Sequence, residues 1–243
     1  MAVGLAVRVA IVVLIGATPL FGQPLADDQS RRQALELYRS GQEHMAAERF
    51  ELAAQSYTAA LEKDPLLGVA HYQLGQAYMN LRQYRSAIEA YKSCLGAMAR
   101  LHALEESSKF EVDKQREEEI RELRIEVSQL KNLSALKRTV LDQRLRALEQ
   151  QRAEWNPEFR PPPFVLLALG SAYFRNGELG PAEEQWEAAV DADPKYGEAH
   201  NNLAVVYMMT RRKKEAENAV KAAEKSGFRV NPQLKEDINK MTS

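Results

Sequence analysis

Residues 163–196 read PFVLLALGSAYFRNGELGPAEEQWEAAVDADPKY, and the order of large and small residues in this stretch decides the fold. Residues 34–67 repeat the order at the same offsets. The matched residues are Leu166, Gly170, Ala182, Trp186, Ala189 and Pro194 in the later stretch and Leu37, Gly41, Ala53, Tyr57, Ala60 and Pro65 in the earlier one. A period of about 34 residues is typical of a two-helix repeat that buries its apolar face only by stacking on further copies.

One more period after each stretch gives residues 68–101 and 197–230. The second repeat lacks the closing proline, with Ala99 in its place, and the fourth has Val220 for the aromatic residue and Phe228 for the proline. Gly177 is expected to end the first helix of the third repeat, because glycine favours the left-handed conformation of a helix C-cap. The residues that fill the helix crossing alternate large and small, as close packing requires. No period of two, as in strands, is present in the repeats.

This pattern resembles the tetratricopeptide repeat family. The resemblance implies an all-α solenoid with two pairs of helix-turn-helix repeats, at residues 34–101 and 163–230, and a role in holding protein partners. The family is not known for catalysis, so the resemblance predicts a scaffold and not an enzyme.

The first 26 residues lie outside the repeats. Arg8 is the one charged residue before Asp27, and an apolar run from Val9 to Ile15 is followed by Gly16, Pro19 and Gly22. This layout predicts a secretory signal peptide over residues 1–26, with an uncleaved membrane anchor as the alternative. The chain is therefore expected to be exported, with the bacterial periplasm as the preferred compartment, and to touch a membrane only through this segment.

Residues 102–160 form a charged insertion between the repeat pairs. Apolar residues at spacings of three and four from Ile120 onward predict helix, and a phase change near residues 132–134 predicts a break, with Ser134 as a possible cap. Residues 105–126 carry a net charge of −4 and residues 131–152 a net charge of +4, which favours an antiparallel helical hairpin. The hairpin is either a solvated spacer or a coiled-coil arm that binds a partner or a second copy of the chain.

The resemblance implies a concave groove lined by positions 2, 5, 9 and 12 of each first helix. The groove residues are Leu35, Tyr38, Gln42, Met45, Val69, Tyr72, Gln76, Met79, Phe164, Leu167, Ser171, Phe174, Asn201, Val205 and Met208, with Glu198 at the remaining position. None is Lys or Arg, which argues against a clamp for a terminal carboxylate. Methionine recurs at the last position, and methionines suit surfaces that accept varied apolar segments. We therefore expect an apolar or amphipathic partner segment here, unless the insertion or the C-terminal helix covers this surface.

No pattern of residues predicts catalysis, a cofactor or a metal. His44, His71 and His200 fall on repeat-core positions, and Cys94 falls on a small buried position and cannot form a disulfide because it is the one cysteine. No motif for zinc, nucleotide or hydrolase chemistry is present. The net charge of −1 gives no reason to expect a nucleic acid.

Residues 231–243 begin with Asn231 and Pro232 and place Leu234, Ile238 and Met241 on one face. This predicts a capping helix that covers the last repeat. Taken together, these patterns predict a non-catalytic interaction scaffold of the cell envelope. The alternatives are a self-associating structural protein built through the insertion and a subunit that tethers or regulates an envelope enzyme.

Overall fold

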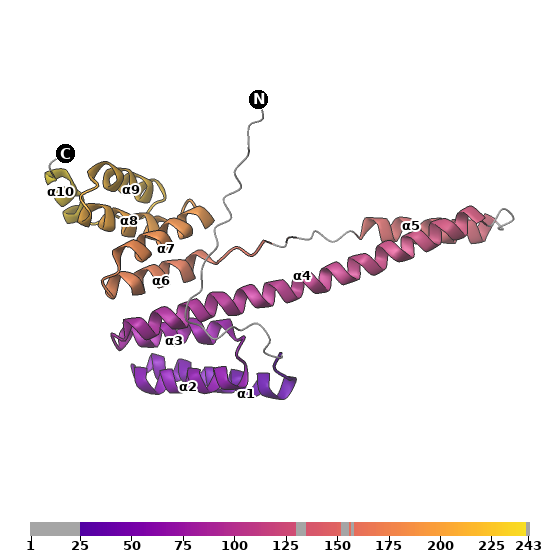
Figure 1. Cartoon of the computed structure of the whole chain (residues 1–243), viewed down its shortest axis with the longest axis horizontal. Coiled ribbons are helices and arrows are strands. Elements are labelled where there is room, and N and C mark those ends of the chain that lie inside the picture. The colour runs from indigo at the N-terminus through magenta and orange to yellow at the C-terminus, as the bar shows by residue number, and fades with distance from the viewer. Residues whose placement is uncertain (1–24, 130–134, 152–155, 157, 242–243) are drawn as a thin grey trace, which may run out of the picture. The chain divides into compact units, whose positions relative to one another are not determined.

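The computed structural model describes residues 25–129, 135–151, 156 and 158–241, and in these residues it contains ten α-helices and no strand (Figure 1). The helices are α1 (Asp28–Ala46), α2 (Phe50–Lys63), α3 (Gly68–Asn80), α4 (Tyr84–Gln129), α5 (Ala135–Gln150), α6 (Pro163–Arg175), α7 (Leu179–Ala192), α8 (Gly197–Met209), α9 (Lys213–Lys225) and α10 (Pro232–Lys240). The predicted all-α fold with two pairs of two-helix repeats, an inserted hairpin and a capping helix is confirmed.

The contacts divide the chain into two compact units, residues 1–96 with 168–182 and residues 97–167 with 183–243. The first unit holds α1, α2, α3, the beginning of α4 and most of α6. The second holds the remainder of α4, α5, most of α7, and α8 to α10.

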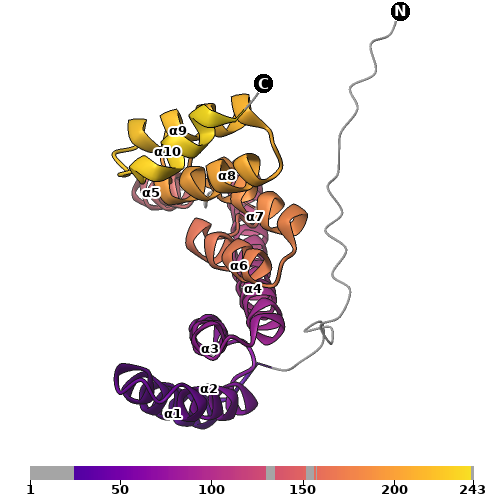
Figure 2. The ribbon, with the colours of Figure 1, turned by 90° about the vertical axis from the view of Figure 1, so that its left-hand side faces the viewer.

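Small residues let the helices of the first unit approach closely. The helices α1 and α2 lie side by side, with α3 next to them (Figure 2). A Cβ atom at Gly41 would stand 2.4 Å from the ring of Tyr57, and one at Gly75 would stand 2.5 Å from the ring of Tyr91. Both tyrosines are completely buried. The alternation of small and large residues in the sequence therefore corresponds to a contact in the structure, in which a tyrosine ring packs against a glycine of the neighbouring helix.

The helix α6 packs on the beginning of α4 although the insertion separates them in sequence. Leu169 and Ala172 of α6 join Ala87, Ile88 and Tyr91 of α4 in one buried cluster. The third repeat thus continues the packing of the second within the first unit.

The turn between the two helices has the same backbone in all four repeats. Its central residue has a positive φ, and these residues are Glu48 (55°), Arg82 (57°), Gly177 (85°) and Arg211 (60°). The next amide in each case donates to the carbonyl five residues back, as Glu178 does to Tyr173 at 2.9 Å. Gly177 confirms the predicted glycine cap, whereas the other three repeats place a side chain in a conformation that disfavours one.

The second unit ends in the predicted capping helix. Asn231 caps α10 by accepting a hydrogen bond from the amide of Gln233 at 2.9 Å, and Leu234 and Ile238 are buried. Phe228 stands in place of the closing proline and packs against Gly197. A Cβ atom on Gly197 would lie 2.5 Å from the Cβ of Phe228. The cap therefore covers the apolar side of the last repeat, as terminal repeats require.

The helix α4 does not end where the second repeat should close. It runs for 46 residues, or about 69 Å at 1.5 Å per residue, and includes Ala99 without a break. Since proline at that position would have broken the helix, its replacement by alanine lets the repeat helix become the first limb of the insertion. The predicted boundary between residues 101 and 102 falls inside this helix, and the domain limits stay predictions.

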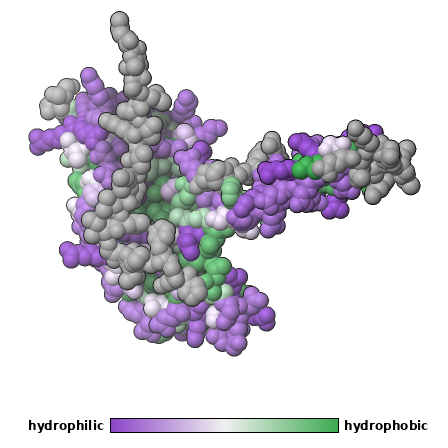
Figure 3. Space-filling model, turned by 45° about the vertical axis from the view of Figure 1, so that its right-hand side comes forward, coloured by the Kyte–Doolittle hydropathy of each residue, from purple (hydrophilic) through white to green (hydrophobic). Residues whose placement is uncertain are grey.

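The insertion is an antiparallel hairpin of α4 and α5, and its surface on the face shown in Figure 3 is mainly hydrophilic. Arg144 Nε donates to Glu119 at 2.8 Å, and Arg124 pairs with Glu149 at 2.6 Å, so the predicted charge complementarity acts within one chain. Ile120 and Leu123 are buried between the limbs. The predicted break and the Ser134 cap lie outside the described residues.

The predicted signal peptide, residues 1–26, also lies almost wholly outside the described residues. Asp27 caps α1, because its side chain accepts from the amide of Ser30 at 2.7 Å. Among the residues that the structure describes, none of the helices is both long enough and apolar enough to cross a bilayer.

Candidate functional site

The predicted groove residues of α1 and α3 lie on the first unit and are at least partly exposed. Leu35 and Val69 have exposed fractions of 43% and 46%. Tyr38, Met45, Tyr72, Gln76 and Met79 are half-buried, and Gln42 is exposed. These residues define what we call the α1–α3 face: Leu35, Tyr38, Gln42, Met45, Val69, Tyr72, Gln76 and Met79.

Two identical pairs of side chains occupy the α1–α3 face. Gln42 Nε2 donates to the Tyr38 hydroxyl at 3.2 Å, and Gln76 Nε2 donates to the Tyr72 hydroxyl at 3.1 Å. In each pair the residues are four apart, which places them on one side of a helix. Four of the predicted groove residues are therefore joined by hydrogen bonds as two Tyr–Gln pairs.

A buried tyrosine orients each tyrosine of the α1–α3 face. The Tyr38 ring lies 5.7 Å from the Tyr57 ring and the Tyr72 ring lies 5.7 Å from the Tyr91 ring, both in tilted contact. Such aromatic pairs are worth roughly 0.5–1.5 kcal/mol beyond burial of their surface. Tyr38 and Tyr72 are therefore held at one end by a ring and at the other by an amide.

The groove methionines also support the repeat packing. Met45 packs against the cluster of Ala53, Tyr57 and Leu74, and Met79 packs against the cluster that contains Tyr91. Met208 of α8 is half-buried. A substitution at Met45 or Met79 would change packing as well as the surface.

The remaining predicted groove residues are in other surroundings. Ser171 and Phe174 belong to the first unit and are half-buried. In the second unit Phe164 is 44% exposed, whereas Leu167 is 9% exposed and its carbonyl accepts from Trp186 Nε1 at 3.1 Å. On α8, Asn201 and Val205 are half-buried and Glu198 is exposed. Leu167 consequently offers a partner little surface.

Charge is scarce on the first helices of repeats two to four, whereas the first helix of repeat one, α1, carries six charged residues, including Glu36, Arg39 and Glu43. The first helix α3 contains no Asp, Glu, Lys or Arg, and α6 and α8 contain one such residue each, Arg175 and Glu198. The second helix α9 contains seven among thirteen residues. The first helices of repeats two to four therefore present an almost uncharged surface.

A second set of polar residues could not be recognised in the sequence as a group. On α4, Ile120, Leu123 and Val127 follow one another at spacings of three and four. The same spacing extends upstream along the helix, where polar residues occupy the positions: His102, Glu106, Lys109, Asp113 and Arg116. We call these five residues the polar seam. Their only signal in the sequence is that spacing, without the apolar character that would have drawn attention to it.

The polar seam binds the main chain that follows α5. Glu106 is buried and accepts from the amide of Asn156 at 2.9 Å, while His102 Nε2 lies 3.1 Å from the Asn156 carbonyl. Arg116, also buried, donates to the carbonyl of Gln151. Lys109 bonds to Glu106 at 2.9 Å, and this contact lowers the pKa of the Glu106 carboxyl. Because α5 has ended here, the irregular backbone obtains its partners from these side chains.

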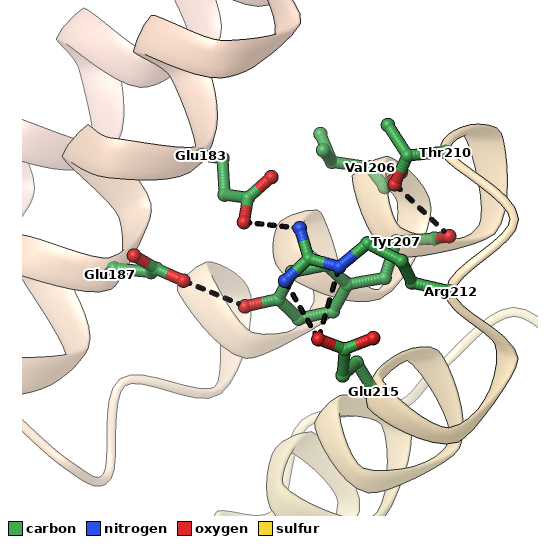
Figure 4. A network of polar contacts seen from close by, with 7 residues as sticks. All are labelled: Glu183, Glu187, Val206, Tyr207, Thr210, Arg212 and Glu215. Atoms are coloured by element: carbon green, nitrogen blue, oxygen red, sulfur yellow. Dashed lines mark hydrogen bonds and ion pairs between the residues drawn. The ribbon is translucent and has the colours of Figure 1, made fainter.

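In the second unit, a network of side chains joins α7, α8 and α9 (Figure 4). Arg212 pairs with Glu183 at 2.5 Å and with Glu215 at 2.8 Å, and its guanidinium lies 4.3 Å above the centre of the Tyr207 ring. The Tyr207 hydroxyl donates to Glu187 at 3.0 Å. Burial and the neighbouring carboxylates raise the pKa of Tyr207, so its hydroxyl stays protonated. Arg212 pairs with two carboxylates and Glu187 accepts from the Tyr207 hydroxyl, so these polar groups have partners within the network and join the helices.

His71, His200 and Cys94 have structural surroundings. His71 and His200 lie 2.9 and 3.0 Å from the carbonyls of Pro65 and Pro194, each joining a repeat to the turn before it. Cys94 is buried, and burial raises the pKa of its thiol to about 12. Within the described residues no three His, Cys, Asp or Glu side chains are grouped as a metal site would require.

The comparisons agree with this geometry. The model of the family described as tetratricopeptide repeat matches residues 38–97 and 167–227, the two repeat pairs on either side of the insertion. No curated protein sequence matches the chain.

Three solved structures illustrate the similarity. The first tetratricopeptide repeat domain of Spaghetti (RPAP3), bound to an HSP90 peptide, is 15% identical, with a TM-score of 0.46 over 77% of this chain and 98% of that one. PilW, a type IV pilus biogenesis factor, is 18% identical, with a TM-score of 0.43 over 89% and 87%. PilF of Pseudomonas aeruginosa is 16% identical, with a TM-score of 0.35 over 85% and 81%. From the matched repeats and the four equivalent turns, the chain belongs to the tetratricopeptide repeat family.

Proposed function

We propose that this protein is a non-catalytic scaffold that holds an apolar or amphipathic segment of a partner protein on the α1–α3 face. The observation that carries the proposal is the repetition of the Tyr–Gln pair on successive first helices, each supported from below by a buried tyrosine. Tyrosines fixed in advance lose little conformational freedom on binding, which is why they are frequent at the centre of interfaces.

The exposed apolar residues beside the pairs support the same role. Leu35 and Val69 stand at one end of the face and keep about half of their surface in contact with water. A partner that covered both would bury roughly 100 Å² of apolar surface there, worth about 2–3 kcal/mol at 25 cal/mol per Å². This burial is one contribution to binding, to which the two tyrosines and the rest of the partner's contacts must add before the cost of association is offset.

Export to the cell envelope is the second part of the proposal. It rests on the sequence of residues 1–26 and on the position of Asp27, where the described helical chain begins. We expect the mature protein to be recovered from the periplasm of a bacterial host with a new N-terminus at residue 23 or 27, since cleavage is expected after Gly22 or Ala26. Full-length chain in the cytosol would contradict export, and full-length chain in the membrane fraction would favour the anchor.

Site-specific photo-crosslinking in intact cells tests the binding face. A photoreactive phenylalanine analogue is placed at position 35 or 69, and a matched control carries it at position 52. Leu52 is equally exposed, at 41%, but lies on the second helix α2. We expect a crosslinked partner band from positions 35 and 69 that is absent from position 52, and that disappears in a Tyr38→Leu/Tyr72→Leu background. Equal crosslinking from all three positions would rule out the face.

A further inference from the structure

A pocket of about 470 Å³ opens between α7, α8 and α9 of the second unit and shares no residue with the α1–α3 face. Its floor is apolar, because Leu203 of α8 and Ala219 of α9 line it and are buried. Val190 of α7 and Ala222 of α9 also line it and are half-buried. The two alanines of α9 leave space that longer side chains would fill, so the pocket has room for a side chain from outside.

The charge of the pocket has one sign. Glu187 and Asp191 of α7 and Glu215 of α9 line it, and no lining residue is Lys or Arg. Glu215 is already paired with Arg212, and one oxygen of Glu187 accepts from the Tyr207 hydroxyl (Figure 4). The carboxylate of Asp191 is exposed and has no partner in the part of the chain that the structure describes. The pocket is therefore complementary to a cation.

The two carboxylates of α7 are placed to share one cationic group. Glu187 and Asp191 are four residues apart, so they lie on one side of the helix and about 6 Å apart along its axis. The three hydrogens of an ammonium group can be donated to more than one carboxylate. A lysine side chain also buries its methylene stem along apolar surface while its charged head stays at the edge. An apolar floor with carboxylates at its exposed edge suits both parts of this side chain.

The first repeat pair provides a comparison within the same chain. At the equivalent positions, Leu74 and Ala90 are again buried, and Glu62 of α2 stands in place of Asp191. Thr58, however, stands in place of Glu187, and its hydroxyl donates to the carbonyl four residues before it at 2.8 Å. At these positions α2 therefore presents one carboxylate, whereas α7 presents two.

From the apolar floor, the single sign of the charge and the paired carboxylates, we propose that this pocket receives a lysine side chain from a basic segment of a partner protein. The methylenes of the lysine lie on Leu203 and Ala219, and its ammonium group lies at Glu187 and Asp191. The pocket is a second docking point, on the second unit, and the proposal does not depend on the α1–α3 face.

A titration followed by the amide shifts of the full chain in two-dimensional NMR tests the proposal, because it detects weak binding and locates it. The probe is the peptide Ac-Ala-Ala-Lys-Ala-Ala-NH2. Its control carries norleucine in place of lysine, which keeps the apolar stem and removes the charge. An exposed ion pair contributes a factor of up to about 5 in affinity. We therefore expect the lysine peptide to bind roughly 5-fold more tightly, with its largest shifts in residues 187–222.

Two variants identify the carboxylates. Asp191→Asn keeps the size of the side chain and removes the carboxylate that has no partner, so it should weaken binding of the lysine peptide about 3-fold or more. Glu62→Gln is the matched control, because it makes the same change of net charge at the equivalent exposed position of α2. This control should leave binding unchanged, and circular dichroism confirms that both variants are folded.

Each contrary outcome overturns the proposal in a different way. Equal binding of the lysine and norleucine peptides, or unchanged binding in Asp191→Asn, removes the cation from the pocket. Equal weakening in Glu62→Gln assigns the attraction to net charge. Butylamine has the stem and the ammonium group without a peptide, and binding as tight as that of the peptide would make this a site for a small amine. Shifts of the same residues on concentrating the chain alone would assign the pocket to a second copy.

Discussion

The repeats and the inserted hairpin use different forces to hold two helices together. In the repeats, a glycine on one helix receives a buried tyrosine ring from the next, as Gly75 does with Tyr91. In the hairpin, exposed ion pairs and the polar seam connect the two limbs, and among its described residues only Ile120, Leu123, Glu106 and Arg116 are buried beyond the repeat helix. The stability of the repeats should therefore be sensitive to changes in side-chain volume. The stability of the hairpin should be sensitive to changes in charge, salt concentration and pH.

The largest expected effect comes from adding one methyl group to the repeat core. In Gly75→Ala the new Cβ would lie 2.5 Å from the buried Tyr91 ring, so helix or ring must move. We expect a loss of about 2–3 kcal/mol in the free energy of unfolding, despite the better helix propensity of alanine. Urea unfolding followed by circular dichroism measures it.

Gly180→Ala is the matched control for this substitution. Gly180 also lies in a helix, α7, but a Cβ there would have no neighbour within 4 Å. The control should be neutral or more stable by up to about 1 kcal/mol. Equal stability of the two variants would mean that the glycine–tyrosine contact does not limit the repeat packing.

The polar seam is the next most sensitive place. Glu106→Ala removes the acceptor of the Asn156 amide and leaves Lys109 without one of its carboxylate partners. The Asn156 amide then loses its hydrogen bond, which costs about 0.5–1.5 kcal/mol. Because the hydrogen bonds of the seam to described residues outside α4 reach Gln151 and Asn156, after α5, we expect faster hydrogen exchange in residues 135–160 with unchanged exchange in α1 to α3.

Lowering the pH should imitate this variant. Since the pKa of Glu106 is lowered in the folded chain, its contribution is present above the ordinary carboxyl pKa and is lost as the pH falls through the folded value. The protection factors of residues 135–160, that is, exchange rates corrected for the intrinsic effect of pH, should therefore decrease in acid in the wild-type chain and change less in Glu106→Ala. Protection factors that fall equally with acid in both chains would assign the pH dependence to other groups.

The comparison also explains which parts of the molecule could be predicted from sequence. The contact between Gly41 and Tyr57 lies within one repeat and recurs at fixed offsets, so the pattern reports the packing directly. The contact between Glu106 and Asn156 joins residues 50 positions apart, and the spacing that marks Glu106 along α4 says nothing of Asn156. The positions of Tyr38 and Tyr72 follow from the repeat register, but their fixed orientation depends on rings that only the folded chain brings beneath them.

A smaller effect on stability is expected from substitutions in the turns, which share one backbone conformation in all four repeats but differ in the residue at the position of positive φ. Arg82 has a φ of 57° and is exposed, whereas the equivalent Gly177 has a φ of 85°. Arg82→Gly should stabilise the chain by about 1 kcal/mol, because a left-handed conformation costs a residue with a side chain roughly 1–2 kcal/mol and glycine regains most of it. The reciprocal Gly177→Ala should destabilise by a similar amount. A loss of stability in Arg82→Gly would show that its side chain contributes more than its backbone costs.

The smallest expected effect is that of a single ion pair in the hairpin. Arg144→Glu places two carboxylates where Arg144 now bonds to Glu119, and both side chains are exposed, at 63% and 36%. Exposed pairs are worth about 0–1 kcal/mol, so the change should appear only as somewhat faster exchange in α5, and about 1 M salt should remove most of it. Arg146→Glu, on the same helix and equally exposed to water, makes the same change of net charge and is the control. The reversed pair Arg144→Glu/Glu119→Arg should restore the wild-type exchange rate if the two side chains interact within one chain. If the reversal restores nothing while light scattering shows a mass near twice 27.4 kDa, the hairpin joins two copies instead.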